Sequence, residues 1–447
     1  MGLESLNAIS AYNTTSYANN TNEKRKITPN IKDEVLYVVV RDPETGKTYK
    51  MTYEQYVKYL QDRFVKNKPQ DKKESSYDLG SERNGVRTID ADNVTISTKP
   101  GSSAPKDYNE KPDKYAEYRT NIAEDNGVID KFAQGQRGDC YLLASIEAIK
   151  NTKDGQEILQ KNVQENPDGS YTITLPGAVV ARNHYIEIGE EDKCAITGRY
   201  TITKAAVEKA KEQSGKAYAF GDINVILFEL AMEAFKAEVA QTNKALGQKS
   251  KEYIAGQFGP MSGKDPLGGG QMYDAIFMLT GQKSDIYDGG RRKRETCKLY
   301  TPGEYGYVGE EPKMLAKGKI GKNSDLVEVN VVYNKDSELQ KLLDKYAGKE
   351  DQFCITVGFV VAKSGPDGST KAGGGHALTV TKITDKYVEV VNPWNTARKE
   401  RIPRGDFEKM ACGLTVTEMN KDKVDKYYEE KVDNKQEKKN VFSWLFK

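Results

Sequence analysis

The sequence predicts an α+β protein, with helices in the middle of the chain and antiparallel strands after them. Apolar residues recur at helical spacing in residues 140–150 and again in residues 223–246. Three later segments are β-branched or alternate between apolar and polar residues, namely 353–361, 376–383 and 386–394. Because helices and strands are segregated along the chain, the α+β class is favoured over α/β.

Three polar segments are expected before residue 116. Residues 1–32 are rich in Asn, Thr, Ser and Ala, so we expect a flexible tail. In residues 33–66, the strand-like stretch DEVLYVVV, a turn and a helical stretch with a Thr52–Gln55 capping box predict a small hairpin plus helix. Residues 67–115 carry few large apolar side chains, which is typical of a linker or a propeptide-like segment.

The most clearly patterned elements lie beyond residue 116. The predicted helix at 140–150 has an apolar stripe and is expected to be buried on at least one side. A shorter helix is expected at 271–281, ended by Gly281, and another at 337–348. The last two strands are expected to be joined by a tight turn at residues 384–386, which makes them antiparallel neighbours.

Composition excludes several classes of protein. The 447 residues include 68 Lys and Arg against 66 Asp and Glu, and a net charge of +2 gives no overall field to attract nucleic acid. No signal-peptide pattern and no membrane-spanning apolar run is found, so we expect a cytoplasmic protein, with leaderless export left open. Five scattered cysteines without a CxxC pair argue against a disulfide framework or a zinc site: Cys140, Cys194, Cys297, Cys354 and Cys412.

The C-terminal segment, residues 419–447, is predicted to be a charged, solvated tail with an apolar end. That end could dock on the protein's own surface, which we favour, or make a peripheral contact with a partner or a membrane surface. Its apolar residues are Val441, Phe442, Trp444, Leu445 and Phe446.

A candidate nucleophile lies in the stretch QGQRGDCYLLAS, residues 134–145. A thiol attacks a carbonyl as thiolate, and a helix N-terminus is one of the environments that stabilise a thiolate. Cys140 has that position, since Asp139 and Cys140 begin the predicted helix. Gly135 and Gly138 would let the backbone turn tightly before it. If Cys140 were an ordinary buried cysteine, Gln134, the two glycines and the helix start would have no common explanation. The other four cysteines are interpreted as ordinary small apolar residues.

The chain holds only two histidines, and one of them has the surroundings of a catalytic base. His376 begins a predicted strand after three glycines, and Asn392 ends the next strand, so the two can face each other. An Asn side chain can hold an imidazole in one tautomer. Trp394 would shield this hydrogen bond from water, and Gln134 could donate an N–H to an oxyanion together with the backbone N–H of Cys140.

The blocks QGQRGDCYLLAS, GGGHALTV and VNPWN, in this order, resemble the three active-site blocks of the calpain family, which are papain-like cysteine endopeptidases with a Cys-His-Asn triad. The resemblance covers roughly residues 116–418. It implies a papain-like two-lobe catalytic domain there, with a helical lobe and an antiparallel β-rich lobe after a polar N-terminal extension. By this resemblance Cys140 is the nucleophile, His376 the general base, Asn392 its orienting residue and Gln134 the oxyanion donor.

The chain departs from that family at two positions, with Tyr141 where Trp is usual and Asn395 where Gly is common. No EF-hand loop is found and no metal site is predicted. The chemistry requires no cofactor, and calcium is considered only as a structural activator.

Other functions stay open from the sequence. The same triad could deamidate or transamidate protein glutamines, or the domain could be a non-catalytic peptide-binding module; protein or peptide is the expected partner throughout. His184 is expected in a strand or at the surface, the basic stretch 289–298 in a surface loop, and the glycine run 268–270 in a turn. A further hypothesis is that the polar segment before residue 116 restrains the peptidase.

Overall fold

The computed structural model describes residues 37–41, 48–52, 79–96, 127–247, 265–287, 295–309, 327–329, 338–364 and 370–433. The chain divides into a small unit within residues 12–76 and a large unit that holds all described residues from 79 onwards. In the small unit, β1 (Tyr37–Arg41) pairs with β2 (Thr48–Thr52) in antiparallel register, which confirms the predicted hairpin. The helix expected after it and the tail 1–32 lie outside the described residues.

The large unit contains a six-stranded antiparallel sheet, in the order β14-β13-β12-β11-β15-β8. Both faces are buried, because neighbouring side chains of one strand enter different cores: Ile355 and Val357 pack in the core with α9 and α10, while Cys354 packs in the core with α3. Its strands are β8 (Asp285–Tyr287), β11 (Phe353–Ser364), β12 (Thr370–Ile383), β13 (Tyr387–Asn392), β14 (Asn395–Pro403) and β15 (Gly413–Glu418).

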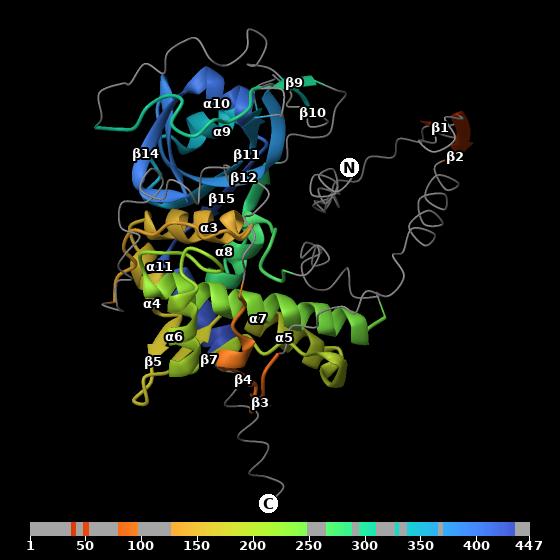
Figure 1. Cartoon of the computed structure of the whole chain (residues 1–447), viewed down its shortest axis with the longest axis vertical. Helices are drawn as coiled ribbons and strands as arrows, with labels where there is room; N and C mark the ends of the chain where they lie inside the picture. The colour runs from red at the N-terminus through yellow and green to blue at the C-terminus, as the bar shows by residue number, and fades with distance from the viewer. Residues whose placement is uncertain are drawn as a thin grey trace, which may run out of the picture. The chain divides into compact units, whose positions relative to one another are not determined.

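Helices and a second, five-stranded sheet also belong to the large unit, and this mixture of helix and sheet agrees with the predicted α+β class. Figure 1 shows α3 and α8 between the six-stranded sheet and the long helix α7. The helices are η1 (Ala91–Asn93), α3 (Cys140–Lys150), α4 (Gly155–Gln160), α5 (Pro176–Glu187), η2 (Glu191–Lys193), α6 (Lys204–Glu212), α7 (Ile223–Ala245), α8 (Met272–Thr280), α9 (Glu338–Tyr346), α10 (Arg404–Met410), α11 (Lys421–Tyr427) and the π-helical turn η4 (Tyr428–Asp433).

The second sheet has five strands in the order β3-β4-β7-β6-β5, and it corrects the predicted domain boundary at residue 116. β4 pairs in parallel with β7, and Ile89 and Val94 are buried in the core that contains α3 and α7. Residues 79–96 are therefore part of the large unit and not of a linker. The strands are β3 (Glu82–Arg83), β4 (Val86–Ile89), β5 (Val163–Glu165), β6 (Tyr171–Thr174) and β7 (Arg199–Ile202); a separate two-stranded ladder joins β9 (Glu295–Cys297) to β10 (Val327–Val329).

The predicted boundary at residue 418 is also wrong. Val424, Tyr428 and Val432 recur every four residues, and all three are buried in the same core as α3. The segment 419–433 is thus a packed part of the large unit, although most of its residues are charged. Residues 434–447, with the apolar end, lie outside the described residues.

The long helix α7 is buried on nearly all sides for most of its length. Asp222 caps its N-terminus by accepting a hydrogen bond from the Asn224 N–H at 2.8 Å. Its apolar residues fill the core, but Glu229, Glu233 and Glu238 are also fully buried. Carboxyl groups in such a place require charged or hydrogen-bonded partners. Glu233 pairs with Arg137, just before Cys140, and Glu238 pairs with Arg87.

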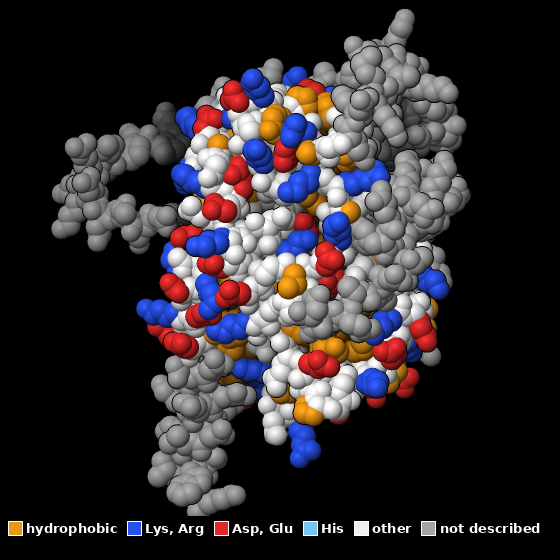
Figure 2. All heavy atoms as spheres, turned by 90° about the vertical axis from the view of Figure 1, so that its left-hand side faces the viewer, with side chains coloured by type: hydrophobic (Ala, Val, Ile, Leu, Met, Phe, Trp, Pro, Cys, Tyr) orange, Lys and Arg blue, Asp and Glu red, His pale blue; other side chains and the backbone are white. Residues whose placement is uncertain are grey.

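Figure 2 shows Lys and Arg side chains interspersed with Asp and Glu over the face that it displays, in keeping with the small net charge. Among the helices of the described residues, none combines the length and the apolar character needed to cross a bilayer.

Candidate active site

Cys140 is the first residue of α3, as the sequence predicts. The helix begins with the N–H groups of Leu142 and Leu143 bonding to the Asp139 carbonyl, at 2.9 and 3.2 Å. Gly135 is required for close approach, because a Cβ there would lie 2.6 Å from the Tyr218 carbonyl oxygen. Gly138 has only ordinary contacts at its Cβ position, the nearest at 3.7 Å, and neither glycine has a positive φ.

The Cys140 thiol is buried, with 8% of the residue exposed. Burial raises its pKa to about 12, although backbone N–H groups, the Ala377 amide foremost, act in the opposite direction. The nearby Asp139 carboxyl raises the pKa further. In this structure the group is therefore a neutral thiol, and its position at the helix N-terminus does not offset the effect of burial.

His376 and Asn392 are brought together as predicted. The Nε2 atom of His376, on β12, lies 2.9 Å from Oδ1 of Asn392, at the end of β13. Trp394 stacks on the imidazole with 4.1 Å between ring centroids. Because Oδ1 can only accept, Nε2 carries the ring proton and Nδ1 holds the basic lone pair. Nδ1 is buried and has no hydrogen-bond partner among the described groups.

The histidine, like the thiol, is uncharged. Burial lowers the pKa of His376 to about 4, while the bond to Asn392 acts against this change. The His376 ring and the Cys140 sulfur both lie where α3 packs against β12. The Ala377 amide that touches Sγ is the next residue after His376, and Thr379 Oγ1 donates to the Ala144 carbonyl at 2.7 Å. No hydrogen bond joins Sγ to the imidazole among the described groups.

Gln134 lies beside the other three residues. Its backbone N–H donates to the Pro393 carbonyl at 2.8 Å, between Asn392 and Trp394. Its side-chain Nε2 donates to the Arg137 carbonyl at 2.6 Å, which uses one of the two amide hydrogens. The structure therefore brings the sequence-predicted quartet into one region, but in a buried arrangement.

Two further hydrogen bonds join Phe132, in the segment before Cys140, to Thr396, just after Trp394. The Thr396 hydroxyl donates to the Phe132 carbonyl at 2.7 Å, and the Phe132 N–H donates to the same hydroxyl at 2.8 Å. The loop carrying Gln134 is thereby fixed against the segment carrying Asn392.

A buried ionic network that sequence reasoning missed supports the Gln134–Asp139 loop. Arg137 makes two hydrogen bonds to Glu233 of α7, at 2.7 and 3.0 Å, and an ion pair with Asp265. Glu233 also accepts from the hydroxyls of Tyr218, at 2.8 Å, and Thr95, at 2.5 Å. Through Glu233, Thr95 connects the segment 79–96 to the loop that bears Gln134 and Arg137. The signal available in the sequence was the set of acidic residues inside the apolar α7 pattern.

Asp139 itself faces another acid. Burial raises its pKa to about 6, while the neighbouring Glu229 and Arg137 act against the rise. Both oxygens of the Asp139 carboxyl are buried and make no hydrogen bond to the described groups. Burial and the Asp139 charge raise the pKa of Glu229 well above its usual range, so the pair holds at least one proton near neutral pH. Glu229 in turn accepts from the Ala219 N–H at 2.9 Å. Asp139, the residue before Cys140, therefore belongs to a partly protonated pair of buried acids.

The glycine run 268–270 has a larger role than the predicted turn. A Cβ on Gly270 would lie 2.4 Å from the Tyr141 ring, and the Gly269 N–H donates to the Gly138 carbonyl at 2.8 Å. Lys236 is hydrogen bonded to the Gly269 carbonyl and lies over the Tyr141 ring. This run therefore packs directly against the start of α3.

The remaining candidates do not join the site. His184 lies on α5, so the expectation of a strand is wrong, and it is half-buried. Cys354 is buried, and Cys194 and Cys412 are half-buried, all as free thiols. Of the basic stretch 289–298, only residues 295–298 are described, with β9 at 295–297.

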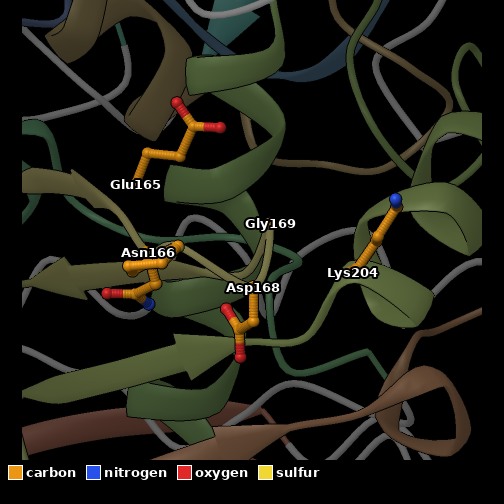
Figure 3. Close-up of a pocket in the computed structure, with 6 residues that line it drawn as sticks. Glu165, Asn166, Asp168, Gly169 and Lys204 are labelled. Carbon is orange, nitrogen blue, oxygen red and sulfur yellow. The ribbon is translucent and has the colours of Figure 1, made fainter.

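A pocket of about 550 Å³ lies at the turn between β5 and β6, and no member of the quartet lines it. Figure 3 shows Glu165 and Asp168 at this turn and Lys204 on α6, with their side chains pointing in different directions.

Among the described residues, no group of three or more His, Cys, Asp or Glu side chains is arranged to hold a metal ion. Compared with protein-family models and with curated proteins, the chain matches none.

Proposed function

We propose that this chain is a cysteine-type endopeptidase that resembles the calpains, acting on protein or peptide substrates. The observation that carries the proposal is the 2.9 Å contact between His376 Nε2 and Asn392 Oδ1, covered by Trp394, beside the helix that begins with Cys140. The division between helices that carry the cysteine and an antiparallel sheet that carries the histidine supports a papain-like two-lobe arrangement.

The proposed chemistry uses His376 Nδ1 as the base. Nδ1 takes the Cys140 proton as Sγ attacks the peptide carbonyl, and the oxyanion that forms accepts hydrogen bonds from Gln134 Nε2 and the Cys140 backbone N–H. The imidazolium then gives the proton to the leaving amine, and the C–N bond breaks to leave a thioester. Water attacks the thioester with the same base, which releases the acid and restores the thiol.

Substrate access requires the quartet to open. Gln134 and His376 are only 1% and 2% exposed, so no substrate carbonyl can reach them in the closed arrangement. Burial also keeps Cys140 and His376 neutral. The closed form therefore corresponds to a resting enzyme, and calcium as a structural activator is one factor that could favour opening.

The test is incubation of the purified full chain with an unfolded protein substrate, with and without calcium. Wild type is expected to generate new peptide termini, and Cys140→Ala none. Cys354→Ala is the matched control, because Cys354 is a buried free thiol that does not belong to the quartet. Mass spectrometry separates cleavage from glutamine deamidation, which shifts mass while leaving the termini intact. Identical products from wild type and a folded Cys140→Ala variant would reject the proposal.

A further inference from the structure

The carboxamide of Asn392 has a second partner, on its nitrogen side. Asn392 Nδ2 lies 3.2 Å from the hydroxyl of Tyr300, and that hydroxyl lies 2.8 Å from Oε2 of Glu400. Together with the bond to His376, these contacts form one chain of four side chains from a buried carboxylate to the imidazole. Neither Tyr300 nor Glu400 has a counterpart in the sequence motifs that identify the quartet.

The direction of this chain is fixed by chemistry. An ionised Glu400 can only accept, so the Tyr300 hydroxyl must donate its hydrogen to it. The Tyr300 oxygen then has only lone pairs to offer, so it must face the NH₂ side of Asn392. The carboxamide oxygen is thereby directed towards His376, where it accepts from Nε2 and also from the Trp394 N–H at 3.0 Å.

Backbone and ring contacts fix the position of Tyr300, so its hydroxyl can orient the Asn392 carboxamide. Its N–H donates to the Val360 carbonyl at 2.9 Å, and its carbonyl accepts from the Ala362 N–H at 2.8 Å, so the backbone is attached to β11. Its ring packs against Phe359 with centroids 5.2 Å apart, and the residue is 0% exposed. Because the backbone and the ring of Tyr300 are both fixed, its hydroxyl stays between Asn392 and Glu400.

We propose that Tyr300 and Glu400 are positioning residues of the cysteine–histidine site, which orient the Asn392 carboxamide and thereby keep His376 in the Nε2–H tautomer with Nδ1 as the base. This inference rests on the proposed function for its catalytic meaning. Its structural part, the tautomer of one histidine, holds whether or not the protein cleaves peptides.

The charge state of Glu400 decides the conditions of the test. Burial raises the pKa of Glu400 to about 7, while hydrogen bonds from Tyr300 and from the backbone of Gly303 and Tyr305 act against this, and the Glu304 charge adds to it. The experiment is therefore done at about pH 8, where Glu400 is mostly a carboxylate and the direction of the hydrogen bonds is defined.

The measurement is the ¹⁵N NMR spectrum of the two imidazole rings in the full chain. Only His184 and His376 contribute, and a His184→Gln variant assigns the signals. In wild type the His376 signals are expected to show a protonated Nε2 and an unprotonated Nδ1. In Tyr300→Phe the ratio of Nε2–H to Nδ1–H is expected to fall roughly fivefold, the value of one hydrogen bond, since the Trp394 N–H contact remains.

Tyr305→Phe is the matched control. Tyr305 lies in the same loop and its hydroxyl also bonds a carboxylate, Asp406, at 2.9 Å, but its side chain does not reach Asn392. This variant is expected to leave the tautomer ratio unchanged. Glu400→Gln is the second variant, in case Tyr300→Phe does not fold. A glutamine can donate to or accept from the Tyr300 hydroxyl, so the ratio is expected to fall by a smaller factor. A folded variant of either kind with the wild-type ratio would overturn the inference.

Peptidase assays then separate the two proposals. Neither Tyr300 nor Glu400 belongs to the quartet that would meet substrate, so Tyr300→Phe is expected to lower kcat about fivefold and to leave KM unchanged. A changed tautomer ratio in a protein that cleaves nothing would retain the positioning role and reject the peptidase. Cleavage with an unchanged ratio would reject the positioning role alone.

Discussion

Replacing Arg87 by Met tests whether residues 79–96 belong to the folded domain. The Arg87 guanidinium lies 2.5 Å from Glu238 of α7, and the two side chains are 8% and 0% exposed. Removing one partner of a buried ion pair costs about 3–5 kcal/mol, because the other charge is left without compensation. Glu238 would retain Thr197 and Tyr200 as donors, so we expect the lower end, about 3 kcal/mol.

The assay is urea unfolding followed by circular dichroism. The free energies of unfolding are compared for variants that share the same m-value, the slope of that free energy against urea concentration. Arg401→Met is the control. Its partner Glu389 lies at 2.7 Å, but the Arg401 side chain is 45% exposed, so we expect little or no loss of stability. Adding Glu238→Gln to Arg87→Met is expected to restore part of the stability, since the unpaired charge is removed. A loss for Arg87→Met no larger than that for Arg401→Met would refute the reasoning.

Three further predictions concern the boundary, the oxyanion donor and the histidine. Removing residues 1–76 is expected to leave the large unit folded, whereas removing 1–96 should abolish its cooperative unfolding by circular dichroism, because β4 leaves the sheet. Gln134→Ala is expected to raise the barrier by about 2.7–4 kcal/mol, seen as a 10²–10³-fold lower kcat with Gln136→Ala as control. The pKa of His376 is lowered in the folded protein, so the unfolded chain binds the extra proton as pH falls from about 6.5 to about 4. Wild type should therefore lose about 3 kcal/mol of stability across that window relative to His376→Gln, measured by urea unfolding at each pH.

The parts of the site that the sequence predicts are those with local or repeated signals. Cys140 was found because a helix start follows a glycine-containing loop, and the His376–Asn392 pair because a tight turn joins their strands. The partners of Arg87 and Arg137 could not be found in this way. Each pairs with a glutamate of α7 far along the chain, and nothing in an isolated arginine distinguishes a buried pair from a solvated side chain.

The packed ends of the large unit were missed for a related reason. β4 has only four residues, so its own apolar pattern is too short to predict a core strand. Its parallel partner β7 follows α5 in the sequence, and nothing local to β4 indicates that pairing. The stripe Val424, Tyr428 and Val432 was present in the sequence but is carried by a segment in which most residues are charged. Average polarity suggested a tail, whereas the spacing of the few apolar residues decided the packing.

The competition between the helix N-terminus and burial explains why the closed site is neutral. A helix N-terminus favours an anion by about 0.3–1 kcal/mol, and up to about 2 kcal/mol in buried geometry. The rise in the Cys140 pKa from its ordinary 9.0 to about 12 corresponds to about 4 kcal/mol against the thiolate, so burial prevails. Burial also disfavours the charged form of His376. Any movement that admits water between α3 and β12 therefore relieves both penalties at once. Under the proposed function, an opening that admits a substrate would also favour the thiolate–imidazolium pair.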